Sequence, residues 1–231
     1  MTPTQRRVLV VAILASFVSF LDGSVVNVAL PAISRELTGG PLTDLALQQW
    51  VVDAYLVTLG SLILLAGSLS DVFGRRRVLL AGLLGFAVAS VLCAIAPTGL
   101  LLVLARALQG VAGALLVPSS LALIIATFSG TAQARAIGIW TAWTGTASIA
   151  GPLLGGLLVD NASWRWVFWI NVPVLAVTLL LVRGVPADEP AATRRRLDVT
   201  GAVLAAVGLA AVVLGLIEQG RLGWSHPLVV V

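Results

Sequence analysis

The sequence predicts an all-α integral membrane protein, and three observations support that prediction. Of its 231 residues, 59% are hydrophobic and only 10% are charged, whereas soluble domains carry about 25% charged residues. The apolar residues form runs of about twenty, the length that an α-helix needs to cross the hydrocarbon core of a bilayer. These runs do not alternate apolar and polar residues as the strands of a membrane β-barrel do. The chain is therefore expected to be a bundle of membrane-spanning helices.

Seven apolar runs are long enough to span a membrane, and an eighth begins at Pro227 and reaches the last residue, Val231. The first run follows two arginines, as the core of a secretory signal peptide does. No small-residue cleavage site follows promptly, so an uncleaved span is expected. The predicted spans are Val8–Leu30, Trp50–Ser70, Val78–Ala96, Leu100–Leu121, Ala136–Leu158, Trp166–Val182 and Val199–Ile217.

The arginines predict the orientation of these spans. With the N-terminus in the cytoplasm, ten arginines fall on the cytoplasmic side, three fall outside, and Arg106 lies within a span; the positive-inside rule therefore places the N-terminus in the cytoplasm. Arginines set between apolar runs also explain the pI near 10.9 better than nucleic-acid binding does. The inner set is Arg6, Arg7, Arg75, Arg76, Arg77, Arg135, Arg183, Arg194, Arg195 and Arg196, and the outer set is Arg35, Arg165 and Arg221.

The stretch "GSLSDVFGRRR" is the turn between the second and third predicted spans. Asp71 stands at the C-terminal end of a helix, where the helix dipole disfavours negative charge. It therefore needs a partner, either Arg75 or the N-terminus of another helix. Gly67 is expected to permit close packing, and Gly74 to permit a tight reversal of the chain. A loop that only provided positive charge would not need this pattern, so the turn is expected to act as a latch for one cytoplasmic-side conformation.

Four stretches together resemble the motifs of one transporter family. The turn is similar to the G-x-L-x-D-x-x-G-R signature of the major facilitator superfamily. "LDGSVVNVALP" in the first span, "RALQGVAGA" in the fourth and "GPLLGG" in the fifth resemble motifs of its drug:proton antiporters. "WRWVFWINVP" and "RRRLDVTGAVL" resemble the fourteen-span branch, often called the EmrB/QacA type. The residues that match the fourth-span motif are Arg106, Gln109 and Gly110; those that match the antiporter motif are Gly138, Gly151, Pro152 and Gly155, with Ala147 where a glycine is usual.

The resemblance implies the N-terminal half of such a transporter. Residues 1–183 would form a six-helix bundle, 184–198 a cytoplasmic loop, and 199–231 the first extra central helix with the start of the second, truncated. The implied activity is proton-coupled efflux of small hydrophobic or cationic compounds by antiport, driven by the proton gradient without a cofactor. The implied setting is the cell membrane, with substrate, protons, the lipid bilayer and the missing C-terminal half as partners.

Two alternatives remain open at this point. The chain could be a truncated, non-transporting membrane fragment, or a transporter of the same fold for another substrate, such as a lipid or a metabolite. The reading frame downstream of Val231 would separate the fragment from the exporter.

Three ionisable residues lie within the predicted spans: Asp22, Asp53 and Arg106. A charge at the membrane centre costs about 2.5–3.5 kcal/mol on the insertion scale, so such residues face a cavity or pair with one another. All three are predicted in the outer half of the membrane, where Arg106 can stabilise either carboxylate. This arrangement suits proton coupling and recognition of substrate charge beside an aqueous cavity. The alternative is a static ion pair that fixes helix packing, and family members often lack a charge at the position of Asp53.

Small residues mark two of the predicted spans. Arg106, Gln109 and Gly110 share one helix face by their spacing of three and four residues, and Gly110 lets another backbone approach closely. Ala147, Gly151 and Gly155 form a similar stripe on the fifth span, where Pro152 bends the helix. The resemblance implies that this stripe packs against the other half and seals it against proton leak; ordinary close packing is the alternative.

The remaining residues do not suggest an enzyme. Cys93 is expected to be a small buried side chain, and the only histidine, His226, lies near the chain end. No Cys/His metal cluster, nucleophile–base pair or phosphate-binding loop is visible in the sequence. The aromatic cluster Trp164, Trp166, Phe168 and Trp169 is expected to anchor the bundle at the outer membrane interface.

Overall fold

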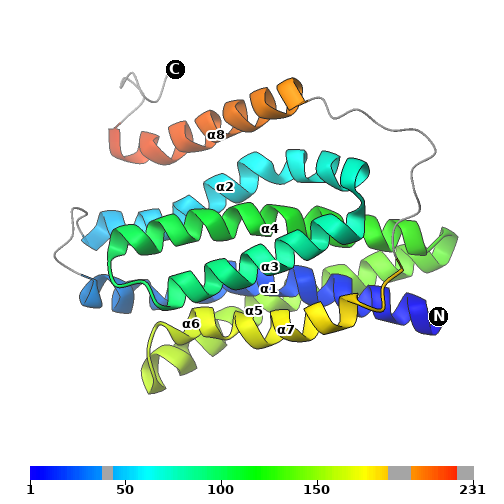
Figure 1. The fold of residues 1–231 in the computed structure, drawn as a ribbon. Helices are drawn as coiled ribbons and strands as arrows, with labels where there is room; N and C mark the ends of the chain where they lie inside the picture. The colour runs from blue at the N-terminus through cyan, green and yellow to red at the C-terminus, as the bar shows by residue number, and fades with distance from the viewer. Residues whose placement is uncertain (38–43, 187–198, 223–231) are drawn as a thin grey trace.

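The computed structural model describes residues 1–37, 44–186 and 199–222 of the chain (Figure 1). These residues form helices joined by short connections. Among these residues five helices, α1 to α5, are long and apolar enough to cross a membrane, which confirms the first five of the seven predicted spans. The helices are α1 (Pro3–Glu36), α2 (Asp44–Phe73), α3 (Arg75–Ala94), α4 (Gly99–Thr127), α5 (Gly130–Asn161), α6 (Trp166–Trp169), α7 (Asn171–Val182) and α8 (Val199–Leu222).

Local sequence signals set the ends of these helices. Thr2 caps α1 in a reciprocal capping box with Gln5, and Thr98 accepts a hydrogen bond from the backbone of Leu101 at the start of α4, which satisfies amides that a helix N-terminus leaves unpaired. Gly74 alone separates α2 from α3 and has φ of 93°. That conformation is open to glycine and strained for other residues, so the tight reversal predicted at Gly74 is present.

The sixth predicted span, Trp166–Val182, is divided into α6 and α7. Pro173 lies three residues into α7 and has no backbone N–H to donate to the turn before it. The helix is consequently interrupted at Ile170, which is in a turn. The interruption places Asn171 at the first position of α7.

Arginines hold the far end of α7. Arg7 of α1 donates from Nη1 to the carbonyl oxygen of Gly184 at 3.4 Å, and Arg76 of α3 donates from Nε to that of Val182 at 3.3 Å. Cations suit a helix C-terminus, where carbonyl groups are left without partners. A Cβ atom at Gly184 would overlap the guanidinium of Arg7, so a larger residue there would displace this flexible side chain from its present position.

The long helices lie side by side, with α3, α4 and α1 in the middle of the view and α8 beyond α2 (Figure 1). The most extensive pairs are α2 with α4, α1 with α5, and α3 with α4; α1 also contacts α7, and α8 packs on α2. Helix α8 covers the predicted seventh span, whereas most of the predicted loop 184–198 and the apolar stretch from Pro227 lie outside the described residues.

The core of the bundle consists of two large apolar clusters at different levels. Along α1, the first cluster reaches from Val8 to Val18 and the second starts at Val25. Helices α3 and α4 show the same division, as does the segment formed by α6 and α7, and each carries polar residues in the gap between the clusters. The buried polar side chains in these four gaps are Ser19, Asp22, Ser90, Arg106, Gln109 and Asn171. They form one polar layer across the bundle.

Candidate functional site

Asp22 is the centre of this polar layer. Its side chain is 0% exposed. Oδ2 accepts a hydrogen bond from Nη1 of Arg106 at 2.5 Å. Oδ1 accepts two more, from Nε2 of Gln109 at 2.9 Å and from Nδ2 of Asn171 at 2.8 Å. Three donors from two other helices therefore converge on one buried carboxylate.

Arg106 links the carboxylate to α2 and α6. Its Nε donates to the backbone oxygen of Val51 at 2.9 Å, at the level where α2 passes the polar layer. Its Cζ lies 4.2 Å from the ring centroid of Tyr55 and 5.9 Å from that of Phe168. Aromatic rings at such distances attract a cation, most strongly where water is excluded. With only 1% of its side chain exposed, Arg106 is a buried charge stabilised by an ion pair, hydrogen bonds and two rings.

The remaining members of the layer are uncharged. Gln109 accepts from Nη1 of Arg106 at 2.7 Å, and its Nε2 also donates to Oγ of Ser90 at 2.9 Å. The thiol of Cys93 lies 3.5 Å from Oε1 of Gln109, and Cys93 is buried, as predicted. The site therefore combines one carboxylate, one guanidinium and two amides, and Nη1 of Arg106 donates both to the carboxylate and to the oxygen of Gln109.

The structure corrects two expectations about the ionisable residues. Asp22 was expected beside an aqueous cavity, but it is enclosed by its own bundle because α3, α4 and α7 cover it. Asp53 was expected to share Arg106 with Asp22, but it is only half-buried on α2 and is not among the partners of Arg106. The ion pair is formed by Asp22 and Arg106.

The turn residues lie apart from this layer, at the other end of α2. Asp71 is exposed on the last turn of α2, and Arg75 begins α3. Gly67 was expected to allow close packing, but a Cβ atom there would meet nothing within 4 Å in the described structure. Of the two turn glycines, Gly74 is the one with a positive φ, which is the conformation that needs glycine.

Gly110 allows α2 and α4 to touch. A Cβ atom at this position would overlap Oγ1 of Thr58 and the carbonyl oxygen of Tyr55. Thr58 fills the remaining space by donating to the carbonyl oxygen of Ala107 on α4 at 2.9 Å. Because Gly110 follows Gln109, this close approach also sets how far the amide reaches into the polar layer.

The small-residue stripe of α5 packs on α1 of the same chain, which corrects the expectation that it faces the other half. A Cβ atom at Gly151 would overlap the side chain of Ser24, and one at Gly155 would lie 2.9 Å from the carbonyl oxygen of Val25. Ser24 also donates to the carbonyl oxygen of Ala147 at 3.3 Å. By contrast Gly138 is exposed and Pro152 lies on the exposed side of α5. The stripe thus fixes α5 against the helix that carries Asp22.

Sequence analysis missed several residues of the site. Asn171 and Ser90 were overlooked because only ionisable residues were sought within the spans, and a polar amide inside "WINVPV" was the available signal. The aromatic cluster was predicted to anchor the bundle at the outer membrane interface. Trp166 is 52% exposed, but Trp164 is only 2% exposed and Phe168 is 0% exposed. Both rings belong to the core because the chain turns inward between α5 and α6, and Phe168 reaches Arg106.

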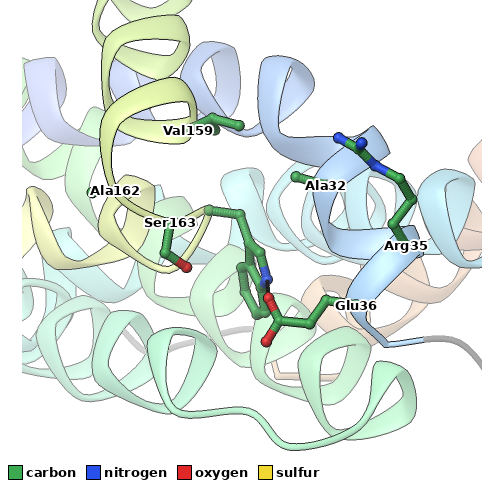
Figure 2. Close-up of a pocket in the computed structure, with 7 residues that line it drawn as sticks. Ala32, Arg35, Glu36, Val159, Ala162 and Ser163 are labelled. Carbon is green, nitrogen blue, oxygen red and sulfur yellow. Dashed lines mark hydrogen bonds between the residues drawn. The ribbon is translucent and has the colours of Figure 1, made fainter.

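A second polar cluster lies beyond the predicted spans, at the end of the bundle far from residue 1. Glu36 accepts a hydrogen bond from Nε1 of Trp164 at 2.7 Å and pairs with Arg165, whose Cζ lies 4.3 Å from the Trp164 ring centroid. The hydrogen bond from Arg165, with that from Trp164, lowers the pKa of Glu36 below its ordinary value of 4.5, although desolvation opposes this. A shallow hollow of about 350 Å³ lies beside the cluster, between the end of α1 and the end of α5 (Figure 2).

The apolar helices, long enough to cross a membrane, and the ion pair buried between them define the class of the chain as an α-helical integral membrane protein. Residues 12–229 match the model of the Major Facilitator Superfamily, so the chain belongs to that family. Its likeness to the human organic anion transporter MFSD10 (TETRAN) shows the same fold, with a TM-score of 0.72 at 18% identity over 98% of this chain and 57% of that one.

Several proteins that are similar in sequence are named as resistance proteins or drug transporters. The chain is 43% identical to the puromycin resistance protein pur8 of Streptomyces alboniger, over 99% of this chain and 45% of that protein. It is 39% identical to the multidrug resistance protein Stp of Mycobacterium tuberculosis, over 100% of this chain and 42% of that protein. It is 34% identical to the multidrug transporter protein MdtP of Bacillus subtilis, over 94% of this chain and 40% of that protein. The chain therefore spans less than half the length of these relatives and corresponds to the N-terminal half of the family fold.

Proposed function

We propose that this chain is the N-terminal half of a proton-driven exporter of small hydrophobic, cationic compounds. The observation that carries the proposal is the buried Asp22–Arg106 pair, with Nη1 and Oδ2 2.5 Å apart inside a membrane-spanning bundle. A buried ion pair is weak support for stability, because desolvating two charges offsets their attraction. Intramembrane carboxylates of this kind commonly belong to proton pathways.

The proposed mechanism uses the change in charge at Asp22. When Asp22 is ionised, it neutralises Arg106 and the polar layer is electrically balanced. When Asp22 takes up a proton, Arg106 is left as a net positive charge, which disfavours a cationic substrate nearby. Substrate and proton would then favour different states of the bundle, which is the requirement for exchange. Because Asp22 is enclosed by its own half, this effect would act through the bundle and not by direct contact with substrate.

The relatives support the substrate class, since their names refer to puromycin and multidrug resistance. The arginine bias supports a cytoplasmic N-terminus, and the proposed location is the cell membrane. In that orientation the Gly74 turn and the arginine clasp on α7 face the cytoplasm. The Glu36–Trp164–Arg165 cluster faces outward.

The second half of the transporter is the proposed partner. Family members of this design bind substrate near the midplane between two repeated halves. We expect residues 1–231 alone to insert with the N-terminus cytoplasmic and to show no proton-coupled efflux in vesicles. Cysteine-accessibility labelling of the loops tests the insertion. Dye efflux driven by an imposed proton gradient tests the transport.

The alternative is a membrane fragment that does not transport. Sequencing the coding region beyond residue 231 and expressing the complete reading frame separates the two. Gradient-dependent export by the complete frame supports the exporter, and an authentic stop codon with no restored transport supports the fragment. Drug–proton exchange by residues 1–231 alone would contradict the two-half proposal.

A further inference from the structure

The side chain of Asn171 is buried and only half satisfied. Its Nδ2 donates to Oδ1 of Asp22 at 2.8 Å and lies 3.4 Å from Oγ of Ser90. Its Oδ1 has no hydrogen-bond partner among the residues that the structure describes, and it is the one buried side-chain atom there of which this is true. Buried polar groups are nearly always paired. The side chain of Asn171 is 0% exposed and lies beside a carboxylate, so its unpaired carbonyl oxygen needs an explanation.

The charge of Asp22 explains why the carbonyl of Asn171 is unpaired. An ionised carboxylate only accepts hydrogen bonds, whereas a side-chain amide donates from nitrogen and accepts at oxygen. Asn171 must therefore turn its nitrogen toward Asp22, which leaves its oxygen without a donor among the described residues. The unpaired oxygen is a consequence of the ionised state.

A protonated Asp22 would have the opposite need. Its new O–H group requires an acceptor, yet all three groups that contact the carboxylate are donors: Nη1 of Arg106, Nε2 of Gln109 and Nδ2 of Asn171. Arg106 carries no acceptor. The oxygen of Gln109 is already held by Arg106 at 2.7 Å. Asn171 is the amide whose oxygen is available.

We propose that Asn171 serves both protonation states of Asp22, as a donor to the carboxylate and, after a half-turn of its amide, as the acceptor for the protonated carboxyl. Asn171 is thus a positioning residue for the proton site, and the inference rests on the proposed function, in which Asp22 exchanges a proton. The proton comes from the aqueous phase and forms one O–H bond on Asp22. Asn171 changes only its hydrogen-bond role and gains or loses no proton.

The surroundings of Asp22 contain few other groups that could take this role. Arg106 on α4 is the charge in contact with it, while Tyr55 on α2 and Cys93 on α3 are the nearby titratable groups. Tyr55 already donates its hydroxyl hydrogen to the carbonyl oxygen of Ser19. Helix α6 contributes the ring of Phe168 to this region, and the part of α5 that packs on α1, residues 144–158, has no ionisable side chain.

Infrared difference spectroscopy on the purified 231-residue chain in lipid tests the proposal without requiring transport. The carbonyl band of protonated Asp22 is assigned as the band that appears at low pH and is absent in Asp22→Asn. In Asn171→Leu we expect this band to move to higher frequency, because the O–H group has lost its acceptor. Asn171→Ala is a second variant in case leucine does not fit. Thr178→Val is the matched control: Thr178 is buried on the same helix and donates to its own backbone at Val174.

The pH dependence of the band gives a second readout. Asn171→Leu removes one hydrogen bond from the charged state and one from the neutral state, so the two losses largely cancel. The pH of half-maximal band intensity should therefore rise by less than about one unit, which corresponds to less than about 1.4 kcal/mol. A larger rise with an unchanged band frequency overturns the proposal, because Asn171 would then act only as a donor to the carboxylate.

The outcomes distinguish this inference from the proposed function. A shifted band in both Asn171 variants, with an unchanged band in Thr178→Val, supports the two roles of the amide. An Asp22 band that titrates but keeps the wild-type frequency in both variants overturns this inference and leaves proton exchange at Asp22 standing. Absence of an Asp22 band at every pH at which the chain stays folded overturns both.

Discussion

Arg106 and Asp22 are 84 residues apart in the sequence, yet Nη1 and Oδ2 lie 2.5 Å apart in the middle of the bundle. Hydrogen bonds and ring contacts from this pair reach α2, α6 and α7, and the amide of Gln109 connects it to α3. A single change of protonation at Asp22 is therefore felt by most of the helices in the bundle at once.

Replacing Asp22 by Asn should separate insertion from transport. The variant keeps the size of the side chain but leaves the buried Arg106 without a counterion, and breaking a buried pair costs up to about 3–5 kcal/mol. We expect normal membrane insertion, a lower unfolding midpoint, and lost or narrowed export of cations by the complete reading frame. Asp44→Asn, at the exposed start of α2, is the control. Dye efflux at the wild-type rate in Asp22→Asn would contradict the role of this carboxylate.

Two glycines of the family motifs should respond oppositely to alanine. Gly110→Ala forces a methyl group onto Thr58 and the backbone of Tyr55, and overpacking of this kind costs about 1–3 kcal/mol. Gly67→Ala meets open space and should leave stability unchanged or raise it by up to about 1 kcal/mol, through helix propensity. Thermal unfolding in detergent, followed by tryptophan fluorescence, measures both. Equal destabilisation by the two changes would show that the α2–α4 contact is not the tight one.

Asp71→Asn is expected to slow transport without weakening substrate binding. Asp71 lies on the exposed last turn of α2, far along that helix from the level of Val51 and the polar layer. Substrate affinity of the complete reading frame, measured in detergent, should stay within a few-fold of wild type while turnover falls. A large loss of affinity with normal turnover would show that the residue contacts substrate.

Glu36 should make stability depend on pH in the acidic range. Its pKa in the folded chain is lowered below the ordinary value of 4.5, first by the hydrogen bond from Arg165. A carboxyl with a depressed pKa stabilises the fold above its ordinary value, and this contribution is lost as pH falls through the folded-state value. We expect Glu36→Gln to lower the unfolding midpoint slightly at neutral pH, since the group is exposed, and to make no difference well below pH 4. A difference that persists unchanged at low pH would assign the effect to packing.

The helices were predictable because length and hydropathy determine them, and the turn at Gly74 was predictable because a one-residue reversal needs positive φ. That Arg106 would stabilise a carboxylate followed from the cost of isolated charge in a membrane, but this cost did not distinguish Asp22 from Asp53. Asn171 was not predictable by that reasoning, because a neutral amide carries a smaller cost and its importance depends on which helix α7 meets. The α5 stripe was assigned to the wrong partner because a row of small residues indicates that another helix packs closely, but does not identify that helix.

The clasp between Arg7 and Gly184 has a consequence for synthesis, because it joins residues 177 positions apart. The first helix of a nascent chain enters the membrane with Asp22 and with an arginine whose acceptor has not yet been translated. Arg106 and Gln109 become available only with α4, and Asn171 only with α7. A ribosome that pauses before residue 171 would leave Asp22 without its hydrogen bond from Asn171 and Arg7 without its acceptor. We therefore expect delays in translation at this point to increase capture of the chain by membrane quality control.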